Sequence, residues 1–224
     1  MLYTGREVFL HLFKRWRFFN IIDANHMPAE LGGLPPLRLV VHASAALLER
    51  GDIVETVRAA LAESGMAPER LLLGIQTPAT RADRDRTAAT VDALAGLGVR
   101  LVLDDFGSGD LHPSMVLEQP VGTVRLSAGD GGASDRSGAI LGSGLIGFAR
   151  GAGLDVIVDA VADPVDALAW RHRGADLLIG PAFAAPVAAE DVATTLDLLA
   201  FRRRSGTLFP DPAVPSGPGG PSGA

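Results

Sequence analysis

Short apolar runs alternate with longer amphipathic stretches along most of the chain. The apolar runs, typical of buried strands, lie at residues 7–13, 37–41, 71–75, 99–103, 123–126, 154–158 and 176–179. The amphipathic stretches, which predict helices, lie at residues 52–65, 81–97, 139–150, 164–173 and 190–203. Strands that alternate with helices indicate a parallel α/β sheet. Seven or eight strands in about 200 residues predict a (β/α)8-like barrel of the TIM type.

Residues with known preferences for helix ends mark the boundaries of these helices. We expect Asp52 to cap the helix that follows it, because a side-chain oxygen there can accept a hydrogen bond from the first free amides. Gly65 and Gly98 are expected to end the helices before them. Pro164 suits the first turn of its helix, where no amide hydrogen is needed.

Two carboxylates follow the central apolar run. Asp104 and Asp105 stand where this strand should emerge from the sheet, and Gly107 and Gly109 allow a sharp turn after them. Barrel enzymes build their sites at the carboxyl ends of parallel strands, so the pair is a candidate site. The alternative is an ordinary turn that ends a strand.

Composition narrows the classes of protein. The chain has 224 residues, a net charge of -6 and no Cys, which argues against a nonspecific nucleic-acid binder and excludes disulfides and thiolate chemistry. No apolar run reaches the roughly 18 residues of a membrane span. Lys14, Arg15 and Arg17 follow the first apolar stretch instead of preceding it, unlike a signal peptide. We expect a soluble cytoplasmic protein with no membrane contact.

The C-terminal end has a different composition. Residues 210–224 contain five Pro and four Gly and almost nothing apolar. Such a segment cannot bury enough surface to offset its ordering entropy. We therefore predict one barrel domain over residues 1–203 and a disordered tail over residues 204–224.

The order of these segments resembles one family. Asp104-Asp-Phe-Gly-Ser-Gly109 resembles the DDFGxG segment of EAL domains, the cyclic-di-GMP phosphodiesterases of bacterial signalling. Further segments resemble the family's other strands, in order: residues 5–16, 41–44, 71–77, 117–127, 156–163 and 175–186. The resemblance covers about residues 5–200 and implies a barrel of the EAL kind.

The resemblance also implies which residues should carry the chemistry. An active EAL domain holds two divalent cations, Mg²⁺ or Mn²⁺, which activate a water for attack on a phosphodiester. At the family's functional positions this chain keeps Asp104 and Asp105 and shortens one Glu to Asp159. The other positions hold His11, His42, Gly74, Thr77, Arg125, Ser127, Ala162 and Ile179. Two adjacent Asp and one more carboxylate are too few for a two-metal cluster, so no catalytic residue and no cofactor are expected.

Three functional interpretations follow. The first is a catalytically inactive EAL-like domain that acts as a regulatory or protein-interaction module in cyclic-di-GMP-type signalling. The second is a weak metal-dependent phosphodiesterase. The third is a re-tooled metal site: His11 and His42 should lie at adjacent strand ends near Asp104 and Asp159, a set that suits Zn²⁺, Fe²⁺ or Mn²⁺. The simpler alternative to the third is that both His fill polar strand ends.

Binding of cyclic-di-GMP without hydrolysis is a separate possibility. Arg15 matches the Arg of the family's Leu-Arg-Trp motif and could keep one phosphate contact, with Arg125 as a second candidate. Phe13, Lys14 and Asp110 depart from the residues expected next to the ligand. Because Asp104 and Asp105 would repel one another once the metals are gone, we also predict that Arg125 forms an ion pair with Asp104.

The connection after the first predicted strand is short. About twenty residues separate Trp16 from Leu37, which predicts a shortened or missing first helix. Its absence would leave uncovered an apolar surface around Phe9, Phe13, Phe18, Phe19 and Ile21. Such a patch is typical of a contact with a protein partner or a second copy of the chain. Alternatively, residues 18–27 cover the gap themselves.

Overall fold

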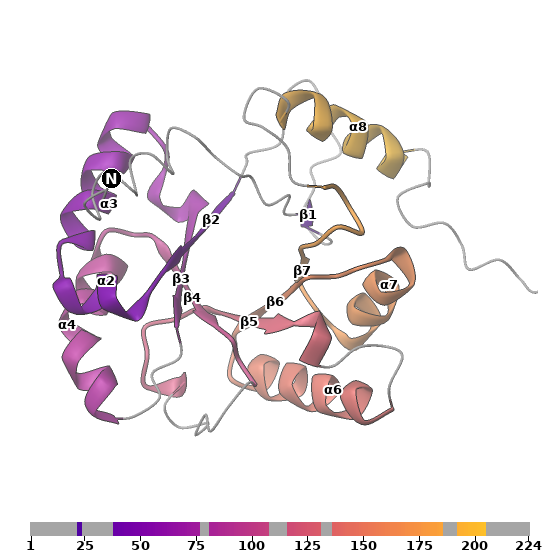
Figure 1. Cartoon of the computed structure of the whole chain (residues 1–224), viewed down its shortest axis with the longest axis horizontal. Coiled ribbons are helices and arrows are strands. Elements are labelled where there is room, and N and C mark those ends of the chain that lie inside the picture. Colours follow the sequence, from indigo (N-terminus) through magenta and orange to yellow (C-terminus); the bar gives the residue numbers. More distant parts are fainter. Residues whose placement is uncertain are drawn as a thin grey trace, which may run out of the picture.

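The strands form one sheet whose order follows the chain. The computed structural model describes residues 22–23, 38–76, 81–107, 116–130, 136–185 and 192–204. The sheet has seven strands in the order β1-β7-β6-β5-β4-β3-β2. The strands are β1 (Ile22–Asp23), β2 (Leu39–Ala43), β3 (Leu71–Gln76), β4 (Arg100–Asp104), β5 (Thr123–Ser127), β6 (Asp155–Asp159) and β7 (Leu177–Leu178). In the described part the sheet curves without joining β2 to β1 and makes a partial TIM-type barrel (Figure 1).

One strand departs from the predicted parallel arrangement. The neighbouring pairs from β2 to β7 are all parallel, as the alternation of strands and helices predicts. β1 instead pairs antiparallel with β7, through Ile22 with Leu178 and Asp23 with Leu177. This two-residue strand was not predicted from the sequence, and it adds an antiparallel edge to the predicted parallel sheet.

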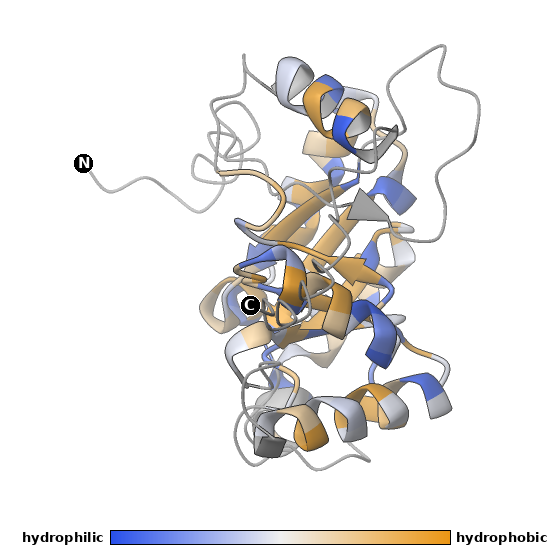
Figure 2. Ribbon diagram, turned by 90° about the vertical axis from the view of Figure 1, so that its right-hand side faces the viewer, coloured by the Kyte–Doolittle hydropathy of each residue, from blue (hydrophilic) through white to orange (hydrophobic). Residues whose placement is uncertain are grey.

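Helices cover the outer face of the sheet. They are α2 (Ala45–Arg50), α3 (Ile53–Ser64), α4 (Arg81–Gly96), α6 (Arg136–Gly151), α7 (Pro164–Arg173) and α8 (Val192–Arg204), with short 3₁₀ turns η1 (Pro68–Arg70) and η2 (Ala128–Asp130). Hydrophobic residues follow the strands and the inner faces of the helices, while the outer turns are hydrophilic (Figure 2). Among the described helices, none is both long and apolar enough to cross a bilayer.

Alternation along the strands divides the core into two layers. Residues on one face of each strand pack against the helices, in the large cluster that includes Leu73, Leu103 and Val158. Residues on the other face fill the inside of the curve as a smaller cluster: Val40, Leu72, Val102, Ile157, Leu177 and Ile179. The polar residues at the carboxyl ends of the strands lie next to this inner apolar layer.

The helix ends test the sequence signals. Pro164 starts α7 as predicted, and Asp163 caps it by accepting hydrogen bonds from the amides of Val165 and Asp166 at 2.8 and 2.9 Å. Gly65 ends α3 in the left-handed region, at φ 66°. The prediction for Asp52 was wrong in part, because α3 starts after it but its side chain makes no cap and pairs with Arg50 instead.

Several predictions concern residues outside the described part of the chain. These are the strand at residues 7–13, the short connection with its apolar patch, His11 and Arg15, and residues 205–224 of the predicted tail. They stay predictions.

Candidate functional site

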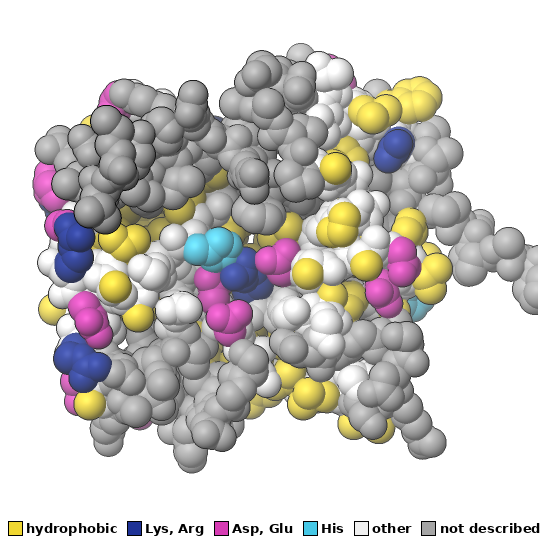
Figure 3. All heavy atoms as spheres, in the orientation of Figure 1, with side chains coloured by type: hydrophobic (Ala, Val, Ile, Leu, Met, Phe, Trp, Pro, Cys, Tyr) yellow, Lys and Arg dark blue, Asp and Glu magenta, His cyan; other side chains and the backbone are white. Residues whose placement is uncertain are grey.

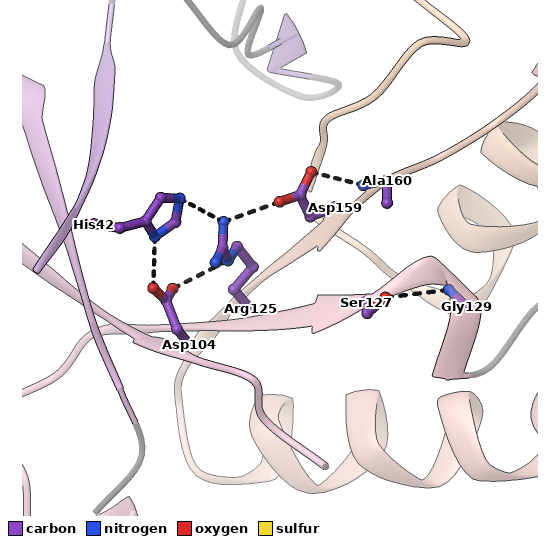
Figure 4. Close-up of polar contacts among 7 residues, drawn as sticks. All are labelled: His42, Asp104, Arg125, Ser127, Gly129, Asp159 and Ala160. Atoms are coloured by element: carbon purple, nitrogen blue, oxygen red, sulfur yellow. Dashed lines mark hydrogen bonds and ion pairs between the residues drawn. The ribbon is translucent and has the colours of Figure 1, made fainter. Parts of the chain in front are cut away.

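Polar residues from four strands meet above the inner apolar layer. His42 lies on β2, Asp104 ends β4, Arg125 lies in β5 and Asp159 ends β6. His42, Asp104 and Asp159 each lie two residues after a member of the apolar inner cluster, and on the same face of the sheet. Figure 4 shows their side chains turned toward one another, and Figure 3 shows basic, acidic and histidine side chains gathered at the centre of this face. We call these residues the strand-end cluster.

The guanidinium of Arg125 is the centre of the strand-end cluster. Its Nη1 donates to Asp159 Oδ2 at 2.9 Å and to His42 Nε2 at 2.8 Å. Its Nε lies 3.0 Å from Asp104 Oδ1, in an ion pair whose N–H is not aligned with the oxygen as a hydrogen bond. The predicted ion pair between Arg125 and Asp104 is therefore confirmed, and the same side chain also binds His42 and Asp159.

The contacts of His42 decide which nitrogen carries its hydrogen. Nε2 faces Arg125, and a guanidinium only donates, so Nε2 is the acceptor. Nδ1 therefore carries the hydrogen and donates it to Asp104 Oδ2, 2.6 Å away. His42 is a neutral bridge between the cation and the buried carboxylate.

Burial increases from the rim of the cluster to its centre. The exposed fraction of the side chain is 38% for His42, 25% for Asp159, 14% for Arg125 and 4% for Asp104. A buried carboxylate needs a compensating charge and hydrogen bonds, because taking it out of water is costly. Arg125 supplies the charge and His42 the hydrogen bond, so the stability of the strand ends depends on this contact.

Gly74 makes the contact between His42 and Asp104 possible. Gly74 lies opposite His42 in the register of β2 and β3, and β3 separates β2 from β4. Neighbouring strands are about 4.8 Å apart, so the imidazole must reach over β3 to meet Asp104. A Cβ at position 74 would lie 2.8 Å from both Cγ and Oδ1 of Asp104, closer than side chains pack. The sequence indicated only that a metal ligand is missing at position 74. The structure shows that a side chain at this position would collide with the carboxyl group of Asp104.

Each site carboxylate is followed by a left-handed residue. Asp105, after Asp104, has φ 55°, and Ala160, after Asp159, has φ 59°. These are the described non-glycine residues with positive φ, a conformation that costs energy and concentrates at functional sites. The turn at Ala160 lets its amide donate to Asp159 Oδ1 at 2.6 Å, so Asp159 is held at both oxygens.

The structure brings together only part of the predicted site. Arg125, His42, Asp104 and Asp159 form the cluster, while Asp105 is exposed on the turn that ends β4. His11 and Arg15 lie outside the described residues. Sequence reasoning did not find the role of Gly74, and the only signal for it was a glycine inside an apolar strand.

The fold and the site agree with a comparison to protein families. The model of the EAL domain matches residues 7–186. The chain belongs to the EAL domain family. The predicted family is therefore confirmed, and the strand-end cluster lies at the carboxyl edge where this type of barrel places its sites.

Curated relatives share the domain within longer proteins. This EAL domain is 29% identical over 160 residues to the cyclic di-GMP phosphodiesterase NbdA of Pseudomonas aeruginosa. The alignment covers 70% of this chain and 20% of NbdA. It is 23% identical over 163 residues to MucR of the same organism, a bifunctional diguanylate cyclase and phosphodiesterase, over 72% of this chain and 24% of MucR. The chain thus spans about a fifth to a quarter of the length of these relatives.

Solved structures share the fold. The EAL domain of Mycobacterium smegmatis DcpA aligns with a TM-score of 0.64 and 23% identity, over 73% of each chain. The EAL domain of Xanthomonas citri FimX in complex with c-diGMP aligns with a TM-score of 0.62 and 20% identity, over 81% of this chain and 68% of the solved chain. At these identities the likeness establishes the fold alone.

The residues of the cluster do not fit the divalent cations of the active family. Within the described ranges, no group of three or more His, Cys, Asp or Glu side chains is arranged to hold a metal ion. The acceptors of His42, Asp104 and Asp159 are directed at Arg125 instead. A guanidinium and a metal cation cannot share these lone pairs, so this arrangement supports no chemistry that depends on a bound metal.

Proposed function

We propose that this EAL domain does not hydrolyse cyclic-di-GMP and acts as a regulatory or protein-interaction module in cyclic-di-GMP signalling. The observation that carries the proposal is the position of Arg125, whose guanidinium contacts Asp104, Asp159 and His42 at once. The family relationship supports the signalling context. A protein partner or a second copy of the chain is the target that this function requires.

Hydrolysis of a phosphodiester needs an activated water. In metal-dependent enzymes the bound cation lowers the proton affinity of water and holds the attacking and leaving oxygens. Arg125 stays protonated, so it cannot accept a proton from water. Nε2 of His42, the atom that could accept one, is occupied by Arg125. The strand-end cluster therefore has no group free to generate a nucleophile.

We expect no hydrolysis of cyclic-di-GMP above background. The purified full chain is incubated with cyclic-di-GMP and Mn²⁺ or Mg²⁺, and the linear dinucleotide product is measured by liquid chromatography. The PaMucR phosphodiesterase serves as the positive control. Product that forms with the unchanged chain and disappears with Asp104→Ala would contradict the proposal, because that variant removes the central carboxylate.

A second candidate function is that of a receptor for cyclic-di-GMP. It is favoured by two structural neighbours, the PaMucR phosphodiesterase and the FimX EAL domain, both solved with c-di-GMP. Arg15 and Arg125 are the residues of this chain proposed to contact phosphate.

Isothermal titration separates the receptor from a purely protein-binding module. If the chain is a receptor, cyclic-di-GMP binds to the full chain without added metal, and Arg15→Ala weakens the affinity roughly tenfold, as expected for a lost charge-assisted contact. Arg50→Ala, which removes an exposed Arg that pairs with Asp52 and is not part of the strand-end cluster, is the matched control. Absence of heat at millimolar ligand would reject the receptor function and leave the interaction module.

A further inference from the structure

Three potential metal ligands surround one guanidinium in the strand-end cluster. His42 Nε2 and Asp159 Oδ2 lie 2.8 and 2.9 Å from Nη1 of Arg125, and Asp104 Oδ1 lies 3.0 Å from Nε. The three acceptors come from β2, β6 and β4, so the sheet and not a loop fixes their positions. One imidazole nitrogen and two carboxylate oxygens are ligand types suited to Zn²⁺ or Co²⁺, but with Arg125 among them the three side chains are not arranged to hold a metal ion.

The atoms of His42 and Asp159 that do not face Arg125 are already fixed by hydrogen bonds, as the outer atoms of ligands are in metal sites. A metal-bound histidine usually donates its second N–H to a carboxylate, which fixes the tautomer. His42 does this with Nδ1 and Asp104 Oδ2, which leaves Nε2 as the acceptor. Asp159 is oriented in the same way, because Oδ1 accepts from the amide of Ala160 and Oδ2 is directed at Arg125.

We infer that Arg125 is a tethered cation that excludes a divalent metal from a three-ligand site made by His42, Asp104 and Asp159. Removing the guanidinium exposes this site, and a transition-metal ion then takes its place. The inference rests on the proposed function in one respect, that the unchanged chain is metal-free. The test of this inference measures metal binding and not hydrolysis. The inference and the proposed function can therefore fail separately.

Charge explains why the guanidinium and the metal compete. Without Arg125, two carboxylates and a neutral imidazole would share the strand ends with no counter-charge. Either a guanidinium or a divalent cation can supply it, but both use the same lone pairs. Ligand-to-metal distances of about 2.0–2.2 Å are shorter than the present contacts to Nη1 and Nε, so the three side chains must move toward one common centre to bind a metal.

The test is a Co²⁺ titration of the full chain, followed by visible absorption and by thermal unfolding after treatment with a chelator. We expect Arg125→Ala to develop the visible d–d bands of protein-bound Co²⁺ at one equivalent. Free Co²⁺ at about 100 times the dissociation constant should raise its melting temperature by roughly 5–10 °C. The unchanged chain and the control Arg50→Ala should show neither effect.

A second change identifies the ligands. In the Arg125→Ala background, Asp159→Asn removes one carboxylate ligand and should abolish the Co²⁺ bands. Arg125→Ser provides a second small residue in case Arg125→Ala folds poorly. Co²⁺ bands in the unchanged chain, or their absence in both Arg125 variants, would overturn the inference. Hydrolysis by the unchanged chain would instead reject the proposed function.

Discussion

Arg125→Ala is expected to destabilise the fold by about 3 kcal/mol or more, as measured by urea unfolding in the presence of a chelator. Removing one partner of a buried ion pair leaves an uncompensated charge, a change that typically costs about 3–5 kcal/mol. Asp104 is 4% exposed and Arg125 14%, so the carboxylate of Asp104 loses its counter-charge in a largely buried position. Asp159 and His42 lose the same contact.

A surface ion pair provides the matched control for this loss. Arg50 and Asp52 lie 2.6 Å apart, with side chains 56% and 45% exposed. Exposed pairs of this kind contribute about 0–1 kcal/mol, because water screens the charges and the long side chain loses conformational freedom. Arg50→Ala should therefore shift the unfolding midpoint only slightly, although the same amino-acid type is removed.

A double-mutant cycle shows whether the two side chains of the buried pair interact. Asp104→Asn removes the charge that Arg125 compensates, so the variant with both changes should recover part of the loss caused by Arg125→Ala. We expect a coupling free energy of roughly 1–3 kcal/mol for side chains in contact. Additive effects in the double variant would show that Arg125 and Asp104 do not meet in solution.

Gly74→Ala should destabilise the chain by about 1–3 kcal/mol, although alanine normally favours ordered structure. The added Cβ would meet the carboxyl group of Asp104, which His42 and Arg125 hold in place. The side chain of Asp104 is too short to move aside while both contacts persist. Urea unfolding measures the loss, and NMR of the His42 imidazole reports whether the Nδ1 contact has broken.

Two comparisons make the Gly74 result specific. Gly147→Ala in α6 has open space around the new Cβ and should stabilise the protein by up to about 1 kcal/mol. In an Asp104→Ala background, Gly74→Ala should lose most of its cost, because the group it collides with is gone. A Gly74→Ala protein as stable as the unchanged chain would mean that position 74 does not constrain the strand-end cluster.

The strands that were predictable are those with a strong local signal. Runs such as residues 71–75 and 154–158 are apolar throughout because both faces of a parallel sheet are buried, and β3 and β6 lie there. β1 is two residues long and joins the sheet by an antiparallel pairing to β7. So short a segment has no periodicity to read, and its partner lies more than 150 residues away in the sequence.

Several residues of the site were predictable from the sequence, but only one contact between them was, the ion pair of Arg125 with Asp104. The strand ends gave the positions of Asp104, Arg125 and Asp159, and the repulsion between neighbouring carboxylates led to the ion pair with Arg125. The bridge from His42 over Gly74 depends on the register of three strands. The spacing of residues in the sequence does not define that register. Gly74 was therefore interpreted as a lost metal ligand, whereas its missing side chain leaves room for the contact between His42 and Asp104.

The most direct test of the central claim is a crystal structure of the unchanged chain grown with excess Mn²⁺, with anomalous diffraction data collected near the manganese absorption edge. The claim is that Arg125 occupies the place of a metal. We expect no anomalous peak at the strand-end cluster and a guanidinium about 3 Å from the acceptors of His42, Asp104 and Asp159. An anomalous peak bound by Asp104 and Asp159, with the Arg125 side chain displaced, would contradict the claim.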